Sequence, residues 1–141
     1  MTGVQTCASD LSEKEFYYDL SQKKLFVSDR GQVPPIRGVN DAIEDGVRAV
    51  VISTAADPND KKYWKVAYLE KYTPQLKAQM EFAKASGQSP EMGRAAAQAH
   101  RLVKRMEDSD WVSLATPEGE RIVSEWTAAG ADGIAPVVCT P

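Results

Sequence analysis

The sequence predicts a single domain of the α+β class, with a small, mainly antiparallel sheet of hairpins and two or three helices. Short runs rich in aromatic and β-branched residues occur in pairs, as the strands of hairpins do. The Ser/Thr-Pro dipeptides at 73–74, 89–90 and 116–117, which are typical helix starts, lie after or between these runs. The chain lacks the regular strand-helix-strand rhythm of a parallel sheet, and its 141 residues are the usual length of one domain.

The first hairpin is predicted near the start of the body of the chain. Residues 16–20 and 24–27 are two strand-like runs, and the short segment 21–23 separates them. A rigid loop is expected to follow at Pro34-Pro35, because each proline fixes its own backbone angle and favours an extended residue before it.

The second pair of strands is expected in the middle of the chain. Residues 47–53 form a branched run that is short enough to be a buried central strand. After a polar loop at 56–62, residues 63–69 alternate like a second strand, and the two runs should pair. The alternation places three residues on one face: Trp64, Val66 and Tyr68. A helix over residues 63–72 is the alternative.

Two helices are predicted next. Thr73-Pro74 starts the first helix and Ser86-Gly87 ends it. Its apolar face would consist of Leu76, Met80 and Ala83. Ser89-Pro90 repeats the start signal, and the alanine-rich segment 94–99 favours a second, peripheral helix.

The last third of the chain predicts another hairpin, a third helix and a final strand. Residues 102–106 and 111–114 flank the acidic turn 107–110. The third helix should start at Thr116-Pro117 and end at glycines 130 and 133, with an apolar stripe of Ile122, Val123 and Trp126. Residues 134–139 read as an edge strand, where Pro136 is tolerated.

Residues 1–11 read as a leader that is not native, because they are similar to the translation of a short-read sequencing adapter. We therefore expect residues 12–141 to form the single α+β domain and the natural N-terminus to be missing. A membrane would be reached only through a lost upstream anchor, since no run of about 18 apolar residues occurs in the chain.

Composition and motifs argue against several classes of function. The net charge is −3, whereas a protein that binds nucleic acid usually has a concentrated patch of basic residues. No glycine-rich phosphate loop is present, and one histidine with two cysteines cannot supply a closed four-ligand zinc site without carboxylates. The acidic segment 57–60 fails the ligand spacing of an EF-hand. The sequence thus assigns no catalytic, cofactor-binding or metal-binding residue, and no cofactor is expected.

The sequence leaves open the role of Cys139 and the placement of three tyrosines. With Cys7 inside the leader, Cys139 is expected to be an unpaired surface or half-buried thiol, the alternatives being a link to another chain or a metal ligand. Tyr17, Tyr18 and Tyr63 are expected in the core or at its rim, although such rings also occur on protein-binding surfaces.

Five segments in the first half of the chain together resemble an uncharacterised family of short bacterial proteins: residues 17–20, 25–27, 34–36, 46–49 and 68–74. The resemblance implies a hydrophobic N-terminal anchor upstream and carries no activity. Many members have a cysteine pair after the third strand, where this chain has residues 53–57 without cysteine.

Two hypotheses of function follow. The first is a non-catalytic, envelope-associated domain that acts on a protein partner through an exposed strand edge or an aromatic surface. The alternative is a small hydrolase or isomerase that uses His100, the one histidine, with a carboxylate of the 107–110 turn such as Asp108 or Asp110. The oligomeric state is left open.

Overall fold

The computed structural model describes residues 13–39, 43–130 and 132–141. Within these ranges the chain forms one small antiparallel sheet with three helices, which confirms the predicted α+β class. The expected leader, residues 1–11, lies outside the described residues. None of the described helices has the length and apolar character needed to cross a membrane.

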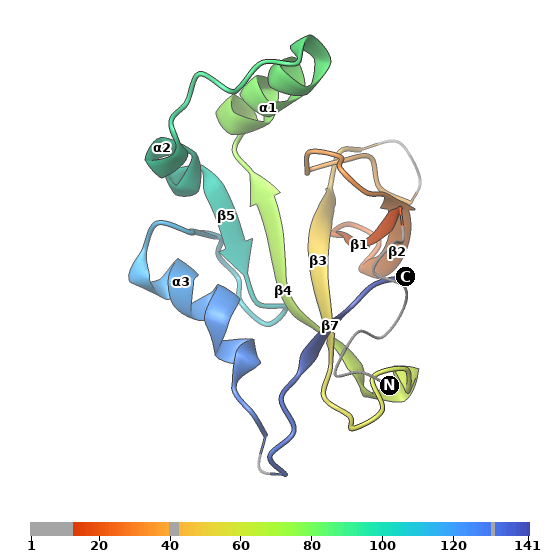
Figure 1. Ribbon diagram of the computed structural model, residues 1–141. Coiled ribbons are helices and arrows are strands. Elements are labelled where there is room, and N and C mark those ends of the chain that lie inside the picture. The colour runs from red at the N-terminus through yellow and green to blue at the C-terminus, as the bar shows by residue number, and fades with distance from the viewer. Residues whose placement is uncertain (1–12, 40–42, 131) are drawn as a thin grey trace.

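The sheet contains seven strands in the described part of the chain, in the spatial order β2-β1-β3-β4-β5-β6 (Figure 1). Their bounds are β1 Lys14–Asp19, β2 Lys24–Asp29, β3 Gly46–Ser53, β4 Trp64–Tyr72, β5 Arg101–Lys104, β6 Val112–Ser113 and β7 Val137–Cys139. The first part of β3 pairs with β1 and its last three residues pair with β7. β1 and β7 therefore lie one after the other along the same edge of the central strand.

The three predicted hairpins are confirmed as β1–β2, β3–β4 and β5–β6, all antiparallel. β4 is a strand of nine residues, so the alternative helix over residues 63–72 is wrong. The predicted final strand is confirmed as β7, which follows Pro136 and pairs antiparallel with β3. The Pro34–Pro35 loop precedes β3, and its peptide bond is cis.

A β-bulge corrects the predicted alternation of β4. Val50 of β3 lies opposite Tyr68, whereas the next residue, Val51, lies opposite Val66, so β4 has one residue more than β3 at this point. The extra residue reverses the alternation. The expectation that Tyr68 shares a face with Trp64 and Val66 is therefore wrong, since Tyr68 points to the opposite face.

Two helix starts agree with the sequence and one does not. α1 (Pro74–Ser86) and α3 (Pro117–Ser124) each follow a threonine whose hydroxyl accepts a backbone N–H of the first turn. α2 (Arg94–Ala99) instead begins after Gly93 without a side-chain cap, so the predicted start at Ser89-Pro90 is wrong. Gly93, a poor residue for a helix interior, separates Ser89-Pro90 from the alanine-rich segment 94–99, and the helix begins only after it.

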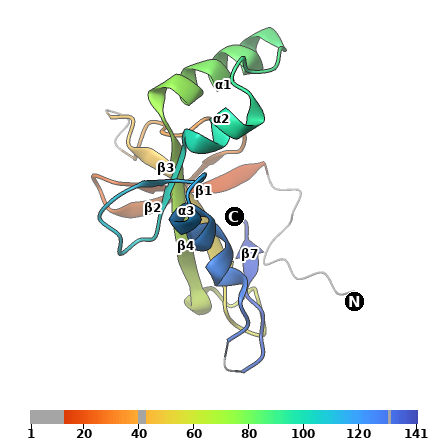
Figure 2. The ribbon, with the colours of Figure 1, turned by 90° about the vertical axis from the view of Figure 1, so that its left-hand side faces the viewer.

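The helices lie at one end and one side of the sheet. α1 continues beyond the end of β4, while α3 lies beside β5, as the two views show (Figures 1 and 2). Leu76 of α1 and Ile122 of α3 are each 1% exposed and are the residues by which these helices join the core.

Side chains of the sheet alternate between two faces of different character. The aliphatic face consists of Phe16, Tyr18, Val47, Ala49 and Leu69, which pack as one cluster. The charged face carries, at the intervening positions, Glu15, Tyr17, Arg48 and Glu70. The polar chemistry of the domain is concentrated on this second face.

Candidate functional site

Glu70 is a buried carboxylate at the centre of the charged face, at 2% exposed. Nη1 of Arg48 donates to Oε1 of Glu70 over 2.9 Å. Nε and Nη2 of Arg101 donate to Oε2 over 2.9 and 2.5 Å. Both carboxylate oxygens therefore have charged donors, as a buried carboxylate requires.

Strand register brings these groups together. Arg48 lies directly opposite Glu70 in the β3–β4 pair, and Arg101 begins β5, the strand beside β4. Nε of Arg48 also lies 3.2 Å from Oε1 of Glu15 on β1. Two acids and two bases thus form one nearly neutral chain of ion pairs across four strands, which we call the Glu70 network: Glu15, Arg48, Glu70 and Arg101.

Tyrosines surround the Glu70 network. Burial, and next the negative charge of Glu70, raise the pKa of Tyr68 and of Tyr72. Burial also raises the pKa of Tyr17 to about 12, and its hydroxyl donates to the carbonyl oxygen of Asp29 over 3.1 Å. All three phenols are therefore neutral near pH 7 and act as hydrogen-bonding groups.

A cavity of about 440 Å3 opens beside the Glu70 network, near the point where β1 ends its pairing with β3 and β7 begins. Its walls include Glu15, Arg48 and Tyr68. Because Arg48 is already bound to two carboxylates, the network offers little net charge to a ligand in this cavity. Its geometry fits a structural role, in which the ion pairs fix the register of β1, β3, β4 and β5.

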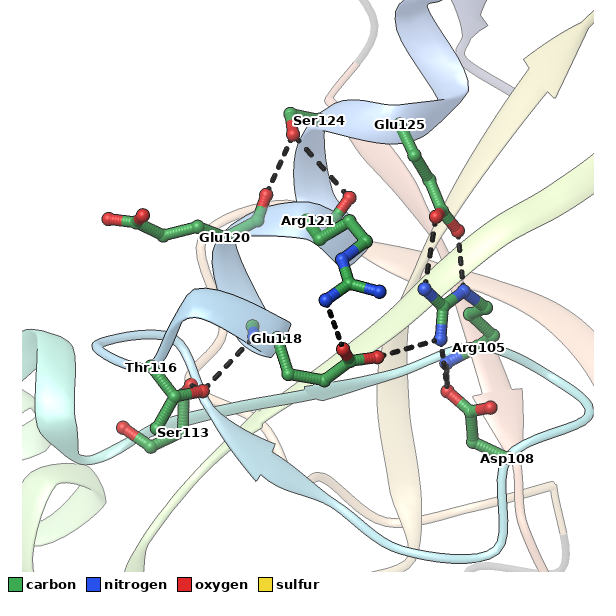
Figure 3. A network of polar contacts seen from close by, with 10 residues as sticks. Arg105, Asp108, Ser113, Thr116, Glu118, Glu120, Arg121, Ser124 and Glu125 are labelled. Atoms are coloured by element: carbon green, nitrogen blue, oxygen red, sulfur yellow. Dashed lines mark hydrogen bonds and ion pairs between the residues drawn. The ribbon is translucent and has the colours of Figure 1, made fainter.

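A second polar cluster fastens α3 to the turn after β5 (Figure 3). Arg105 donates from Nε and Nη2 to Glu125 over 2.5 and 3.0 Å. Its Nη1 lies 3.2 Å from carboxylate oxygens of both Asp108 and Glu118. One guanidinium thus joins the 107–110 turn to both ends of the α3 segment.

The Arg105 cluster predicts a pH-dependent contribution to stability. The hydrogen bonds from Arg105 hold the pKa of Glu125 below its ordinary value. A carboxyl group with a lowered pKa in the folded state stabilises that state above its unfolded pKa, about 4.3, and loses this contribution as pH falls through the folded pKa. Glu125→Gln should therefore be less stable than the wild type at pH 6, and the difference should shrink below pH 4, as measured by urea unfolding.

Glu107→Gln is the matched control for this pH series. Glu107 is exposed in the same turn and takes part in none of the ion pairs of Arg105. Its substitution should leave the free energy of unfolding within about 0.5 kcal/mol of the wild type at both pH values. A Glu125→Gln difference that stays constant from pH 6 to pH 3 would contradict the assignment.

The structure does not bring His100 together with the acidic turn. Nδ1 of His100 lies 2.7 Å from the hydroxyl of Thr73, and the backbone N–H of Thr73 donates to the carbonyl of His100 over 3.0 Å. The 107–110 turn lies at the other end of β5, where Asp108 binds Arg105. His100 thus joins the start of α1 to the start of β5.

Cys139 differs from its expectation as an unpaired thiol. It is buried, 3% exposed, next to Val51, and it is disulfide-bonded. The sequence contains one other cysteine, Cys7, which lies outside the described residues. The expectation of an unpaired thiol is therefore wrong.

Segment 57–60 forms a turn in which its acids bind backbone groups. Oδ1 of Asp57 accepts the N–H of Asn59 over 3.0 Å, and Asp60 caps the short 3-10 turn Lys61–Tyr63. Among the residues that the structure describes, no three histidine, cysteine or acidic side chains converge as metal ligands would.

Tyrosines and neighbouring apolar residues differ in exposure. Tyr17 is fully buried, Tyr18 is intermediate, and Tyr63 is 48% exposed. On the edge strand β2, Leu25 and Val27 are 37% and 48% exposed. These two side chains lie opposite Tyr18 and Phe16 of β1, so that an apolar surface continues from the aliphatic face to the edge of the sheet.

Sequence reasoning missed the charged residues that lie inside strands of the sheet. Arg48 interrupts a run of branched residues and Glu70 follows Leu69 in a strand, and a charge at such a position requires a partner. Asp19 was missed too: it is fully buried, and its carboxylate accepts the backbone N–H groups of Ser21, Gln22 and Val39. A charged residue within a strand-like run was the signal in the sequence that could have indicated these buried contacts.

The chain was compared with known protein families, curated proteins and solved structures. No family model matches the chain, and the searches of curated proteins and of solved structures return no match either.

Proposed function

We propose that this chain is a non-catalytic domain of the cell envelope that binds another polypeptide through the outer edge of β2. The observation that carries the proposal is the exposure of Leu25 and Val27 on a strand that pairs, among the described strands, with β1 alone. We call this surface the β2 edge and define it by Leu25 and Val27 together with Phe16 and Tyr18 behind them.

The β2 edge has the chemistry of strand addition. The outer side of an edge strand presents backbone N–H and C=O groups, and a further strand can pair with them while its side chains pack on the exposed face. β2 is six residues long and contains no proline, whereas the other terminal strands, β6 and β7, have two and three residues. A long unprotected edge is the better template for pairing.

The polar clusters support a role without catalysis. Glu70 is bound to two arginines, Arg105 is bound to three carboxylates, and His100 is bound to Thr73. Each of these groups has partners within the fold that explain its position. The residues with the most polar contacts thus hold strands and helices together.

The resemblance of five segments to a family whose members carry a hydrophobic N-terminal anchor supports a location in the cell envelope. The DNA upstream of the codon for Ser12 tests this part of the proposal. A hydrophobic leader in the same reading frame would support it. A start codon close to Ser12 with no such leader would contradict it.

A photo-crosslinking experiment tests the binding surface. A photoreactive phenylalanine analogue is placed at position 27 or, as the control, at Phe82, which is 67% exposed on α1. Irradiation of cells that produce the protein should give a covalent product from position 27 and little from position 82. No product from position 27, or equal products from both positions, would contradict binding at the β2 edge.

A further inference from the structure

We infer that the strand added to β2 is β2 of a second copy of this chain, antiparallel and with Phe26 opposite Phe26 of the second copy. The inference rests on the proposed function of the β2 edge and names its partner. The observation that carries it is the order of side chains along β2. When two copies of β2 pair with Phe26 at the centre, apolar side chains and opposite charges meet; with Val27 at the centre they do not.

Geometry restricts the possible registers. Two copies of one strand can pair in an antiparallel sheet only about a two-fold axis that is perpendicular to the sheet. Side chains that lie opposite one another point to the same face, so a residue can oppose only residues an even number of positions away. The axis near the centre of β2 therefore passes through Phe26 or through Val27.

With the axis at Phe26, apolar side chains meet apolar ones and opposite charges meet. Leu25 lies opposite Val27 of the second copy, and symmetry repeats this pair on the other side of the axis. Lys23, in the turn just before β2, would lie near Asp29 of the second copy, also twice. The two side chains that the edge leaves most exposed, Leu25 and Val27, would cover each other.

With the axis at Val27, the same strand opposes itself poorly. Leu25 would lie opposite Asp29 of the second copy, which sets an aliphatic side chain against a carboxylate. Lys24 would lie opposite Arg30, a pair of like charges, and such pairs are destabilising. The sequence of the edge thus selects the register at Phe26.

The charged ends of the edge are accessible for this pairing. The side chain of Asp29 is 73% exposed and forms an ion pair of 2.5 Å with Lys14 of its own chain. A carboxylate has two oxygens and can accept a second ammonium group. Lys23 is exposed in the turn just before β2, with a φ of 53°.

Sedimentation equilibrium of the purified full chain tests the self-pairing. The wild type should show a monomer–dimer equilibrium that depends on protein concentration. Val27→Lys places a charge opposite Leu25 at two points of the interface and should weaken the dimer by about tenfold or more. Phe82→Lys, on the exposed face of α1, should leave the equilibrium unchanged. A wild type that stays monomeric, or a dimer that Val27→Lys does not weaken, would overturn the inference.

A charge exchange tests the register. Lys23→Asp would set Asp near Asp29 at both ends of the interface and should weaken the dimer by about tenfold, because two attractive pairs of charges become repulsive. The double variant Lys23→Asp with Asp29→Lys restores opposite charges and should recover most of the affinity. A double variant that is weaker than the single one would overturn the register at Phe26.

The crosslinking experiment separates failure of this inference from failure of the proposed function. A product from position 27 with twice the mass of the chain supports self-pairing. A product of any other mass, together with a monomeric wild type, overturns self-pairing and leaves the β2 edge as a surface for a different protein. The absence of any product from position 27 overturns both.

Discussion

Replacing Glu70 with alanine is expected to lower the free energy of unfolding by about 3 kcal/mol. Removal of one member of a buried ion pair typically costs about 3–5 kcal/mol, because the remaining charge is left without a partner. The lower end of this range applies here, since the side chains of Arg48 and Arg101 are 38% and 35% exposed and can turn toward water. The alanine also leaves Arg48 with Glu15 as its remaining ion-pair partner in the Glu70 network.

Urea unfolding followed by tryptophan fluorescence measures this effect. Glu81→Ala is the control, because Glu81 forms an exposed ion pair of 3.1 Å with Lys77 one helical turn away, and loss of such a pair costs about 0.5 kcal/mol or less. If Glu70→Ala costs no more than Glu81→Ala, the Glu70 network does not hold the sheet together.

The Glu70 network also shows where prediction from the sequence ends. Strands and hairpins were predictable because alternating and branched residues reveal them locally, as in residues 47–53, which became β3. The pairing of Arg48 with Glu70 depends on the register between two strands and on a bulge between Val50 and Val51. Neither the register nor the bulge is visible as a local pattern in the sequence. The strands were therefore predicted correctly while the Glu70 network was not.

The same limit applies to His100 and Cys139. The sequence placed His100 only eight residues from Asp108, yet β5 lies between them and separates them along the sheet. Cys139, near the end of the chain, gave no local sign of burial or bonding, and only the fold shows that it is buried and disulfide-bonded. Distance along the chain therefore predicted contacts poorly wherever an extended strand intervenes.

Gly119→Ala is expected to destabilise the domain by about 3 kcal/mol, although helix propensity alone predicts the opposite. Alanine in place of glycine within a helix normally gains about 1 kcal/mol. Gly119, however, is buried in α3 against the end of β6, and a Cβ there would lie 2.8 Å from Cα of Leu114 and closer still to the carbonyl oxygen of Ser113. Both neighbours are backbone, so they cannot move aside as a flexible side chain can.

Relief of this clash requires α3 to move away from β6, and that movement would weaken several contacts together. Ile122, 1% exposed, would leave the core, and the ion pairs of Glu118 and Glu125 with Arg105 would lengthen. Gly93→Ala is the matched control, because a methyl group added at Gly93 would meet no other atom within 4 Å, and it should cost less than about 1 kcal/mol. Urea unfolding compares the two variants, and a Gly119→Ala protein as stable as the wild type would show that α3 does not approach β6 this closely.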